Sequence, residues 1–552
     1  MTGPSDSSVR RADWLLVAVL SLGVFCIAQR HAFFSPCVIN DDLRQQLYWM
    51  ARWLDASLYP PDLLGDYSAA YVPVGLKALY YPLVAGLGID PLLASKLVSG
   101  GLFVLLALSL FGLGIALEGR TLGFFTAAMA WLMPFFLKNI SGGLSRGFAG
   151  PLLALFLLVW VRRRDAAMAA VLLVQALCIP YIAILCAGCA CLDAVWGRLT
   201  DRAAAPFPAR PWHGVVLAVA AGLVWVTNRT VTGSDFGPLV GHALLSTQPE
   251  FTAAGRLELF PLPNPFFDLI YWPFESIGLF LDIGLFTGIA SLVMLAPVVV
   301  YGARRTPWLA LAHKARPAVM LLAGSLALYL MARAVALLLF VPDRYISYSI
   351  NLLYALLLAI VLRHALSGLL ARRLSGAVLI LLAVGLGAWR LTNVGLYDYT
   401  AEEPLYAAIR ELPKDALIAG NPEVLDNVLT FGRRNVVASF ELAHPWSQGY
   451  WRRYMPRLGH QAEAYYAKDA ATVIDFARFY GVTHIVVREA DFTPAALAGD
   501  PLFAPFTARI RELAALPGNF VLLDETKFPY TSPEPGIRLV DMRPYTAQAV
   551  SP

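Results

Sequence analysis

Long apolar segments recur along most of this chain, and they constrain its fold more than any single motif does. A helix needs about 20 predominantly apolar residues to cross the roughly 30 Å of hydrocarbon in a bilayer. The chain is 58% hydrophobic and 15% charged, far more apolar than a soluble domain of its length. The sequence therefore predicts a polytopic α-helical membrane protein, with spans near residues 13–29, 92–117, 121–137, 147–161, 213–229, 276–301, 317–340, 345–363 and 375–392.

A further apolar segment, 166–192, is interrupted by Pro180 and forms either one kinked span or two short ones. Arg and Lys accumulate in cytoplasmic loops, so the loop charges decide between these alternatives. They fall on one side of the membrane only if 166–192 crosses twice. This predicts about 11 spans, the N-terminus inside, the C-terminus outside, and cytoplasmic basic residues at positions 10–11, 120, 162–164, 198–210, 304–316 and 363–373.

The predicted topology divides the chain into a transmembrane domain, 1–395, and a more polar C-terminal domain, 396–552. Long outer loops at 30–91 and 230–275 lie on the same side of the membrane as the second domain. Strand patterns that alternate with helical patterns predict an extracytoplasmic α/β layer there. The expected strands cover 416–420, 435–440, 484–489, 519–525 and 536–542, and the expected helices cover 402–411, 448–466, 470–480 and 503–515.

Several functional classes are not supported by the residues. The net charge of +5 comes from basic residues scattered near span ends, so no nucleic-acid partner is expected. The C-terminal domain has no glycine-rich phosphate loop between a strand and a helix, which argues against a nucleotide site. Cys186, Cys189 and Cys191 lie in an apolar run without accompanying His, so they are interpreted as small buried hydrophobes and not as metal ligands.

Two adjacent carboxylates, Asp41 and Asp42, lie in the first outer loop about a dozen residues beyond the first span. Apolar residues at helical spacing over 43–58 predict an amphipathic helix that lies along the membrane surface. A second short helix is predicted over 74–87. Asn40, Asp41 and Asp42 directly precede the first helix, so N-capping alone is one interpretation. The other is that one carboxylate caps the helix while the other is catalytic. Asp66, in the same loop, is a further candidate for substrate binding.

Arg146 lies in a tight outer turn, KNISGGLSRGFAGP, between two predicted spans. Glycines let a substrate headgroup approach the backbone closely, and an arginine there can bind a phosphate with two parallel hydrogen bonds. Lys138, in the same turn, would add positive charge. The alternative is an ordinary interfacial arginine whose charged end reaches the water.

Arg344 lies in FVPDRYISYS, between two predicted spans. Asp343 can hold the guanidinium in place, and Tyr345 can stack on a substrate or hydrogen-bond to it. The alternative is a surface ion pair within an aromatic belt. Arg333 lies deeper and therefore needs a partner, for which Asp282 is a candidate.

The second outer loop carries acidic and imidazole side chains that could shape an acceptor site, but their spacing fits no metal motif. They are His242, Glu250, Glu258, Asp268 and Glu275. In the C-terminal domain, His444 and the pair Asp426–Asn427 are interpreted as turn residues.

The layout resembles the GT-C superfamily of integral membrane glycosyltransferases, which take a sugar from a polyprenyl-phosphate carrier. The resemblance rests on the first span and the outer loop after it, which carries carboxylates and two short helices, NDDLRQQLYWMARW and VPVGLKALYYPL. It extends to the SGGLSRGFAGP turn, the proline-broken helices at ALCIPYIA, the PDRY sequence between two predicted spans and the tail containing GVTHIVVRE.

This resemblance implies that Asp41 or Asp42 is the general base on an acceptor hydroxyl, while Arg146 and Arg344 receive the carrier phosphate. The aspartates are adjacent and do not form a spaced Asp-x-Asp, and the tail has no Trp-Trp-Asp sequence. No cofactor is firmly implied, although a divalent cation could join the two aspartates. The expected partners are a polyprenyl-phosphate sugar, membrane lipids and a glycan, lipid or protein acceptor, at the periplasmic face of a bacterial inner membrane.

Two other functions fit the same composition. A transporter or flippase of lipid-linked glycans is expected to show repeated discontinuous helices in corresponding halves, and the sequence has a single clear broken hairpin. A non-catalytic assembly protein that displays the tail domain would tolerate changes at Asp41 and Asp42.

Overall fold

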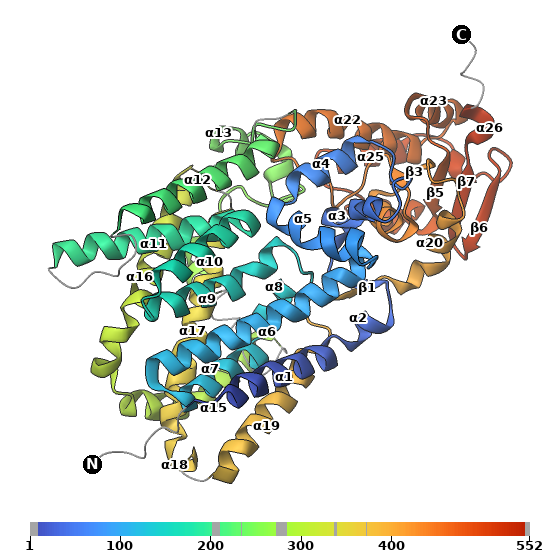
Figure 1. Cartoon of the computed structure of the whole chain (residues 1–552). Helices are drawn as coiled ribbons and strands as arrows, with labels where there is room; N and C mark the ends of the chain where they lie inside the picture. Colours follow the sequence, from blue (N-terminus) through green and yellow to red (C-terminus); the bar gives the residue numbers. More distant parts are fainter. Residues whose placement is uncertain are drawn as a thin grey trace.

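The computed structural model describes residues 9–200, 210–232, 235–271, 284–335, 339, 341–370 and 373–546. A bundle of helices forms one part of the molecule, and a smaller part built on a sheet packs at one end of it (Figure 1). The main bundle helices are α1 (Arg11–Ala28), α6 (Pro91–Glu118), α7 (Arg120–Leu132), α9 (Ala149–Val161), α10 (Asp165–Cys178), α11 (Pro180–Leu199), α12 (Pro211–Thr232), α15 (Gly284–Arg305), α16 (Trp308–Val335), α17 (Ser347–Ala365) and α19 (Arg373–Arg390).

These helices lie at the apolar ranges that predict spans. Among the described residues, five helices are long and apolar enough to cross a membrane. A sixth is added if α7 and α8 (Pro134–Ile140), which meet at a 62° bend, count as one span. Four shorter apolar helices of 10 to 17 residues lie among the described residues. The count of about 11 spans stays a prediction.

The segment 166–192 contains two helices, α10 and α11, which meet at Pro180. Arg162, just before α10, donates to the Gly112 carbonyl at 3.4 Å. At the end of α11, Arg316 Nε donates to Asp193 at 2.5 Å, and nearby Lys314 donates to the Leu117 carbonyl. Both ends of this helix pair therefore lie near the C-terminal part of α6. Two membrane crossings by 166–192 stay a prediction.

The first outer loop lies at the opposite end of the bundle, between the bundle and the sheet (Figure 1). It contains β1 (Val38–Ile39), α3 (Leu43–Gln46), the 3-10 helix η1 (Tyr48–Trp53), α4 (Leu63–Tyr71) and α5 (Val74–Tyr81). The prediction of one amphipathic helix over 43–58 is wrong. Arg44 and Gln45, expected on its solvent-exposed face, are buried together with Leu47 and Met50. The reason is that the C-terminal part covers this segment, so both of its faces pack against protein.

A five-stranded sheet forms the centre of the C-terminal part, in the order β4 (Asn435–Val436), β3 (Leu417–Gly420), β5 (His484–Arg488), β7 (Ile537–Asp541), β6 (Tyr530–Glu534). β3 pairs in parallel with β4 and β5, whereas β7 is antiparallel to both neighbours. Helices accompany it near the predicted ranges: α20 (Glu403–Arg410), α22 (Gln448–Tyr465), α23 (Ala470–Tyr480) and α25 (Phe506–Ala515).

One predicted strand is wrong. Residues 519–525 contain the 3-10 helix η10 (Val521–Leu523), and the sequence analysis missed β6. β6 and β7 form a hairpin whose turn contains Gly536, with φ +79°. This local hairpin places β7 beside β5 and β6 at the edge of the sheet.

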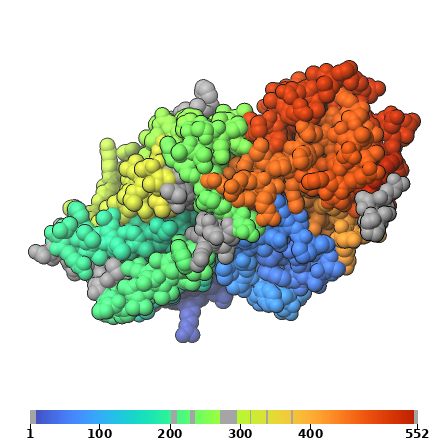
Figure 2. All heavy atoms as spheres, turned by 90° about the horizontal axis from the view of Figure 1, so that it is seen from above, coloured from blue at the N-terminus to red at the C-terminus, as the bar shows by residue number. Residues whose placement is uncertain are grey.

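A short ladder joins the two parts of the chain. β2 (Tyr397–Asp398) pairs antiparallel with β1, with Val38 opposite Asp398 and Ile39 opposite Tyr397. The first residues of the predicted C-terminal domain are thus hydrogen-bonded to the first outer loop. Figure 2 shows the orange and red C-terminal residues lying against the blue loop and the green residues of the second outer loop.

Candidate active site

Asp41 and Asp42 follow β1 after one residue, Asn40, and Asp42 is the N-cap residue of α3. Neither side chain caps the helix, because the cap side chain accepts no backbone hydrogen bond. Each carboxylate instead pairs with a guanidinium, Asp41 with Arg44 and Asp42 with Arg146. N-capping alone therefore does not account for these two residues.

Asp41 is held through one of its two oxygens. Its Oδ1 accepts from Arg44 Nη2 and from the Tyr399 hydroxyl, the latter at 2.6 Å. The Arg44 guanidinium lies over the Tyr399 ring, 4.5 Å from its centroid, which fixes both donors. No hydrogen bond to Oδ2 is found among the described residues, and the side chain is 34% exposed. Asp41 thus keeps an oxygen available to a ligand.

Asp42 is held through both oxygens. Oδ2 lies 2.5 Å from Arg146 Nη1, and Oδ1 accepts from Gln45 Nε2 at 3.2 Å. Arg146 also donates to Asn40 Oδ1 at 3.1 Å. Asn40 in turn donates to Ser141 Oγ and to the Gly395 carbonyl. The predicted acid and the predicted phosphate ligand therefore form one hydrogen-bonded unit.

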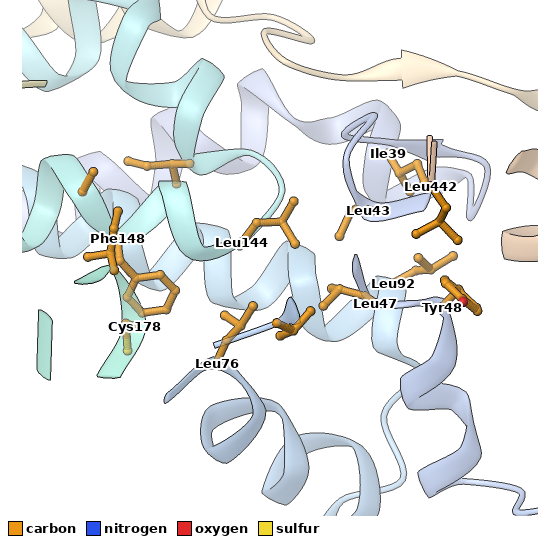
Figure 3. Packing of buried hydrophobic residues seen from close by; sticks show 14 of the residues in the cluster. Ile39, Leu43, Leu47, Tyr48, Leu76, Leu92, Leu144, Phe148, Cys178 and Leu442 are labelled. Carbon is orange, nitrogen blue, oxygen red and sulfur yellow. The ribbon is translucent and has the colours of Figure 1, made fainter. Parts of the chain in front are cut away.

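Apolar neighbours of these charged residues pack together, which fixes the backbone from which the charged side chains extend (Figure 3). Ile39 and Leu43 flank the two aspartates, and Leu144 and Phe148 flank Arg146. Leu442, from the C-terminal part, joins the same cluster and is fully buried. The charged groups thus extend from a well-packed base, as preorganised chemistry requires.

Arg344 lies at the start of the span Pro342–Ala365 and is linked to the Arg146 turn by short contacts. It donates to the Tyr348 hydroxyl at 3.3 Å, and Tyr348 donates to Asn139 Oδ1 at 3.3 Å. Asn139 belongs to α8, which leads into that turn. Arg344 is 34% exposed, and Asp343 is 3.9 Å away. Both predicted phosphate ligands therefore lie at the same end of the bundle.

The structure does not bring the other predicted substrate ligands to the aspartates. Tyr345 is buried, and its hydroxyl donates to the Leu339 carbonyl at 2.6 Å. Lys138 is exposed at the end of α8, and Asp66 is exposed in the first turn of α4, which Asp62 caps instead. A part for Lys138, Tyr345 and Asp66 in substrate binding stays a prediction.

The sequence analysis missed several residues of the site because they come from the distant C-terminal part. Asp426 and Asn427, interpreted as turn residues, are buried, and Asn427 Oδ1 accepts from Arg44 at 3.0 Å. Glu441 accepts from Gln45 Nε2 at 3.1 Å and lies 3.6 Å from Arg256. Burial and the negative charge of Asp41 raise the pKa of Glu441 to about 7. The sequence offered one signal, a charged residue, Glu441, in the largely apolar run before His444.

His444 has a structural role. It is buried, its Nδ1 lies 3.0 Å from the Tyr67 hydroxyl, and its ring stacks on Trp446. Burial lowers its pKa well below the usual value, so the imidazole is neutral at pH 7. This packing attaches α4 to the C-terminal part.

The second outer loop contributes supporting contacts. Glu250 is buried and accepts from Trp451 Nε1 at 3.1 Å, while His242 and Glu258 are exposed. Arg333 pairs with Asp268 at 3.6 Å. Glu275 and Asp282, the proposed partner of Arg333, lie outside the described residues. Within the described ranges, no group of three or more His, Cys, Asp or Glu side chains is arranged to hold a metal ion.

The fold has counterparts among solved structures. Archaeal oligosaccharyltransferase AglB from Archaeoglobus fulgidus, solved with an inhibitory peptide and a dolichol-phosphate, is similar with a TM-score of 0.51 and 13% identity. The match covers 98% of this chain and 74% of AglB, which is a GT-C glycosyltransferase. This chain has the GT-C fold.

Two further GT-C proteins were compared with it. ArnT from Cupriavidus metallidurans gives a TM-score of 0.49 at 13% identity and covers 98% of both chains. The arabinofuranosyltransferase AftD from mycobacteria gives 0.46 at 17% identity, over 88% of this chain and 35% of AftD. No protein-family model and no curated protein matches this GT-C chain in sequence.

Proposed function

We propose that this GT-C protein is a membrane glycosyltransferase that moves a hexosyl or pentosyl group from a polyprenyl-phosphate donor to an acceptor hydroxyl on a glycan, lipid or protein. The proposal rests on the ion pair of Asp42 with Arg146, which lies beside Asp41. Only one of the two carboxylate oxygens of Asp41 accepts hydrogen bonds. The dolichol-phosphate bound to AglB supports a lipid-phosphate donor. We place this site on the periplasmic face of a bacterial inner membrane, because basic residues gather at the other end of the bundle.

In the proposed reaction, Asp41 is the general base. Its Oδ2 is available, whereas both oxygens of Asp42 already accept hydrogen bonds. Asp41 takes the proton of the acceptor hydroxyl as the acceptor oxygen bonds to the anomeric carbon of the donor sugar. Such help is worth roughly 10² to 10⁴ in rate. Asp42 has the separate role of orienting Arg146.

Arg146 and Arg344 bind the leaving group. As the new bond forms, the bond between the anomeric carbon and the phosphate oxygen breaks, and polyprenyl phosphate leaves with the electron pair. Guanidinium groups held in place by Asp42 and Tyr348 neutralise the charge that develops there. A lipid-linked donor presents its phosphate at the membrane interface, which explains why these groups gather at one end of the bundle.

The test is release of polyprenyl phosphate from a panel of polyprenyl-phosphate sugars by purified protein in lipid nanodiscs. Wild type is compared with Asp41→Ala, Asp42→Ala and the matched control Asp500→Ala, whose carboxylate is 83% exposed on the C-terminal part. We expect turnover of at least one donor by wild type and Asp500→Ala, and its loss in both site variants. No donor consumption by wild type in nanodiscs, together with donor that crosses the bilayer of sealed proteoliposomes, would contradict glycosyl transfer and support transport.

A further inference from the structure

A groove lies between α1 and α19, which run side by side along one edge of the bundle (Figure 1). Its volume is about 490 Å³, within the range of roughly 300 to 1,000 Å³ that is usual for small-molecule sites. It lies where α1 leads into the first outer loop and α19 leads into β2. The lining residues are Ile27, Arg30, Gly385, Ala388, Trp389 and Thr392.

The outer ends of the two helices are tied together beside this groove. The backbone N–H of Asn393 donates to the Ala28 carbonyl at 2.9 Å. Gln29, which is buried, donates from Nε2 to the Val394 carbonyl at 3.2 Å. These bonds hold the two walls in place relative to each other, so the groove is preformed, and a ligand that enters it loses little free energy to ordering of the protein.

Gly385 leaves the groove open. A Cβ atom added to this residue would meet no protein atom within 4 Å. Gly387, two residues further along α19, is different, because a Cβ atom there would lie 2.6 Å from the Trp131 carbonyl oxygen. Gly387 thus lets α19 pack closely against α7, whereas the missing side chain of Gly385 creates open space at the surface of the bundle.

The walls of the groove suit a lipid chain. Ile27 is 51% exposed and Trp389 is 68% exposed, on one helix that is long and apolar enough to cross a membrane and one shorter apolar helix. Tryptophan is typical of the level at which a bilayer meets water. The Thr392 hydroxyl already donates to the Ala388 carbonyl at 3.0 Å. The described lining contains no carboxylate or amide side chain with which to bind a sugar.

Arg30 gives the groove a positive charge. Its Nη1 donates to the Ile27 carbonyl at 3.2 Å, and no ion pair with a carboxylate is found for it among the residues that the structure describes. A guanidinium binds phosphate through parallel hydrogen bonds. An arginine that only reaches the water at a membrane surface needs no groove, whereas Arg30 lines one. The charge and the apolar walls together are complementary to an anionic lipid.

We propose that this groove binds an anionic membrane phospholipid. Arg30 binds the phosphate, and part of one acyl chain lies over Gly385 between α1 and α19, while the rest of the lipid stays in the bilayer. The site is separate from the proposed donor site, because neither Arg146 nor Arg344 lines it. It also does not depend on glycosyl transfer, since it concerns a lipid that is not consumed.

The headgroup preference is the first test. Native mass spectrometry of the full chain in detergent micelles, without donor, gives dissociation constants for phosphatidylglycerol and phosphatidylcholine with identical acyl chains. We expect one phosphatidylglycerol to bind about fivefold to tenfold more tightly, because the choline group cancels the charge that Arg30 attracts. Equal binding of the two lipids would overturn the proposal.

Removing the charge of Arg30 locates the headgroup. We expect Arg30→Gln to lower the affinity for phosphatidylglycerol about fivefold to tenfold, to the value for phosphatidylcholine. Arg452→Gln is the matched control, because Arg452 is exposed on α22 in the C-terminal part and does not line the groove. It should bind both lipids as wild type does. A wild-type preference in Arg30→Gln would overturn the site.

Filling the groove locates the chain. Gly385→Leu places a side chain in open space, so we expect the fold to persist and the binding of phosphatidylglycerol to weaken about tenfold. Gly376→Leu is the matched control, because Gly376 also faces open space on α19 but does not line the groove. Undiminished binding in Gly385→Leu would contradict the proposal. Polyprenyl phosphate that displaces phosphatidylglycerol at a lower concentration than phosphatidylglycerol itself would assign the groove to the carrier lipid and overturn it as well.

Discussion

Asp42 Oδ2 lies 2.5 Å from Arg146 Nη1, so that the first outer loop is tied to the turn between α8 and α9. These two residues are far apart in the sequence and come from separate parts of the predicted topology. Their contact joins a carboxylate to a guanidinium that can bind phosphate. In the proposed mechanism this contact orients Arg146 toward the donor phosphate.

Because of this pairing, Asp42 and Arg146 should act as a unit. In Arg146→Ala we expect the donor KM to rise at least about tenfold, since a charged hydrogen bond to phosphate is lost. Asp42→Asn leaves Arg146 without its ion pair, and the double variant should be no worse than the more damaging single one. Kinetics of the four proteins measure this coupling. Strictly additive losses would contradict it.

The Tyr399 hydroxyl has a positioning role that a conservative variant can isolate. Tyr399→Phe removes the 2.6 Å hydrogen bond to Asp41 and keeps the ring beneath Arg44. Loss of this donor leaves the Asp41 carboxylate held by Arg44 alone, so we expect kcat at pH 7 to fall about fivefold to tenfold with an unchanged donor KM. A wild-type kcat would exclude Tyr399 from this role.

Glu441 should make stability depend on pH. Its pKa is raised from 4.5 to about 7 in the folded protein, because burial disfavours the carboxylate. The folded state therefore binds the proton more tightly than the unfolded state does. The stabilisation is complete below pH 4.5 and is lost as pH rises to about 7, by at most about 3 kcal/mol. Unfolding temperatures between pH 5 and 8 should fall less in Glu441→Gln than in wild type. Parallel curves would contradict this assignment.

Leu442 should contribute to the attachment of the C-terminal part to the first outer loop. It is fully buried and packs in the cluster with Ile39 and Leu43. Leu442→Ala leaves a cavity and should cost about 2 to 5 kcal/mol. Leu516→Ala is the control, because that side chain is 52% exposed. Limited proteolysis should release C-terminal fragments faster from Leu442→Ala only. Equal rates in the two variants would argue against this role.

The sequence predicted those features that depend on local composition. Helices lie at the apolar ranges, because the tendency of a long apolar segment to form a buried helix depends on its own residues and not on distant ones. Pro180 separates α10 from α11 for a similarly local reason, since proline ends a helix. Strands β3, β5 and β7 follow short apolar runs in the same way.

Features that depend on contacts between distant segments could not be predicted. The pattern over 43–58 indicates an amphipathic surface helix, but the C-terminal part buries Arg44 and Gln45 beside Glu441 and changes the local structure. Asp426 and Asn427 resemble turn residues until Arg44 is placed next to them. The site is formed by residues from both halves of the chain, so neither half predicts it alone.

The single-turnover rate of Asp41→Asn, with a donor that wild type consumes, tests the central claim most directly. The substitution keeps shape and removes the base, so we predict a rate roughly 10² to 10⁴ lower with an unchanged dissociation constant for the donor. Asp42→Asn, measured in the same assay, should lower the rate and also raise the dissociation constant for the donor. A wild-type rate in Asp41→Asn would contradict its assignment as the general base.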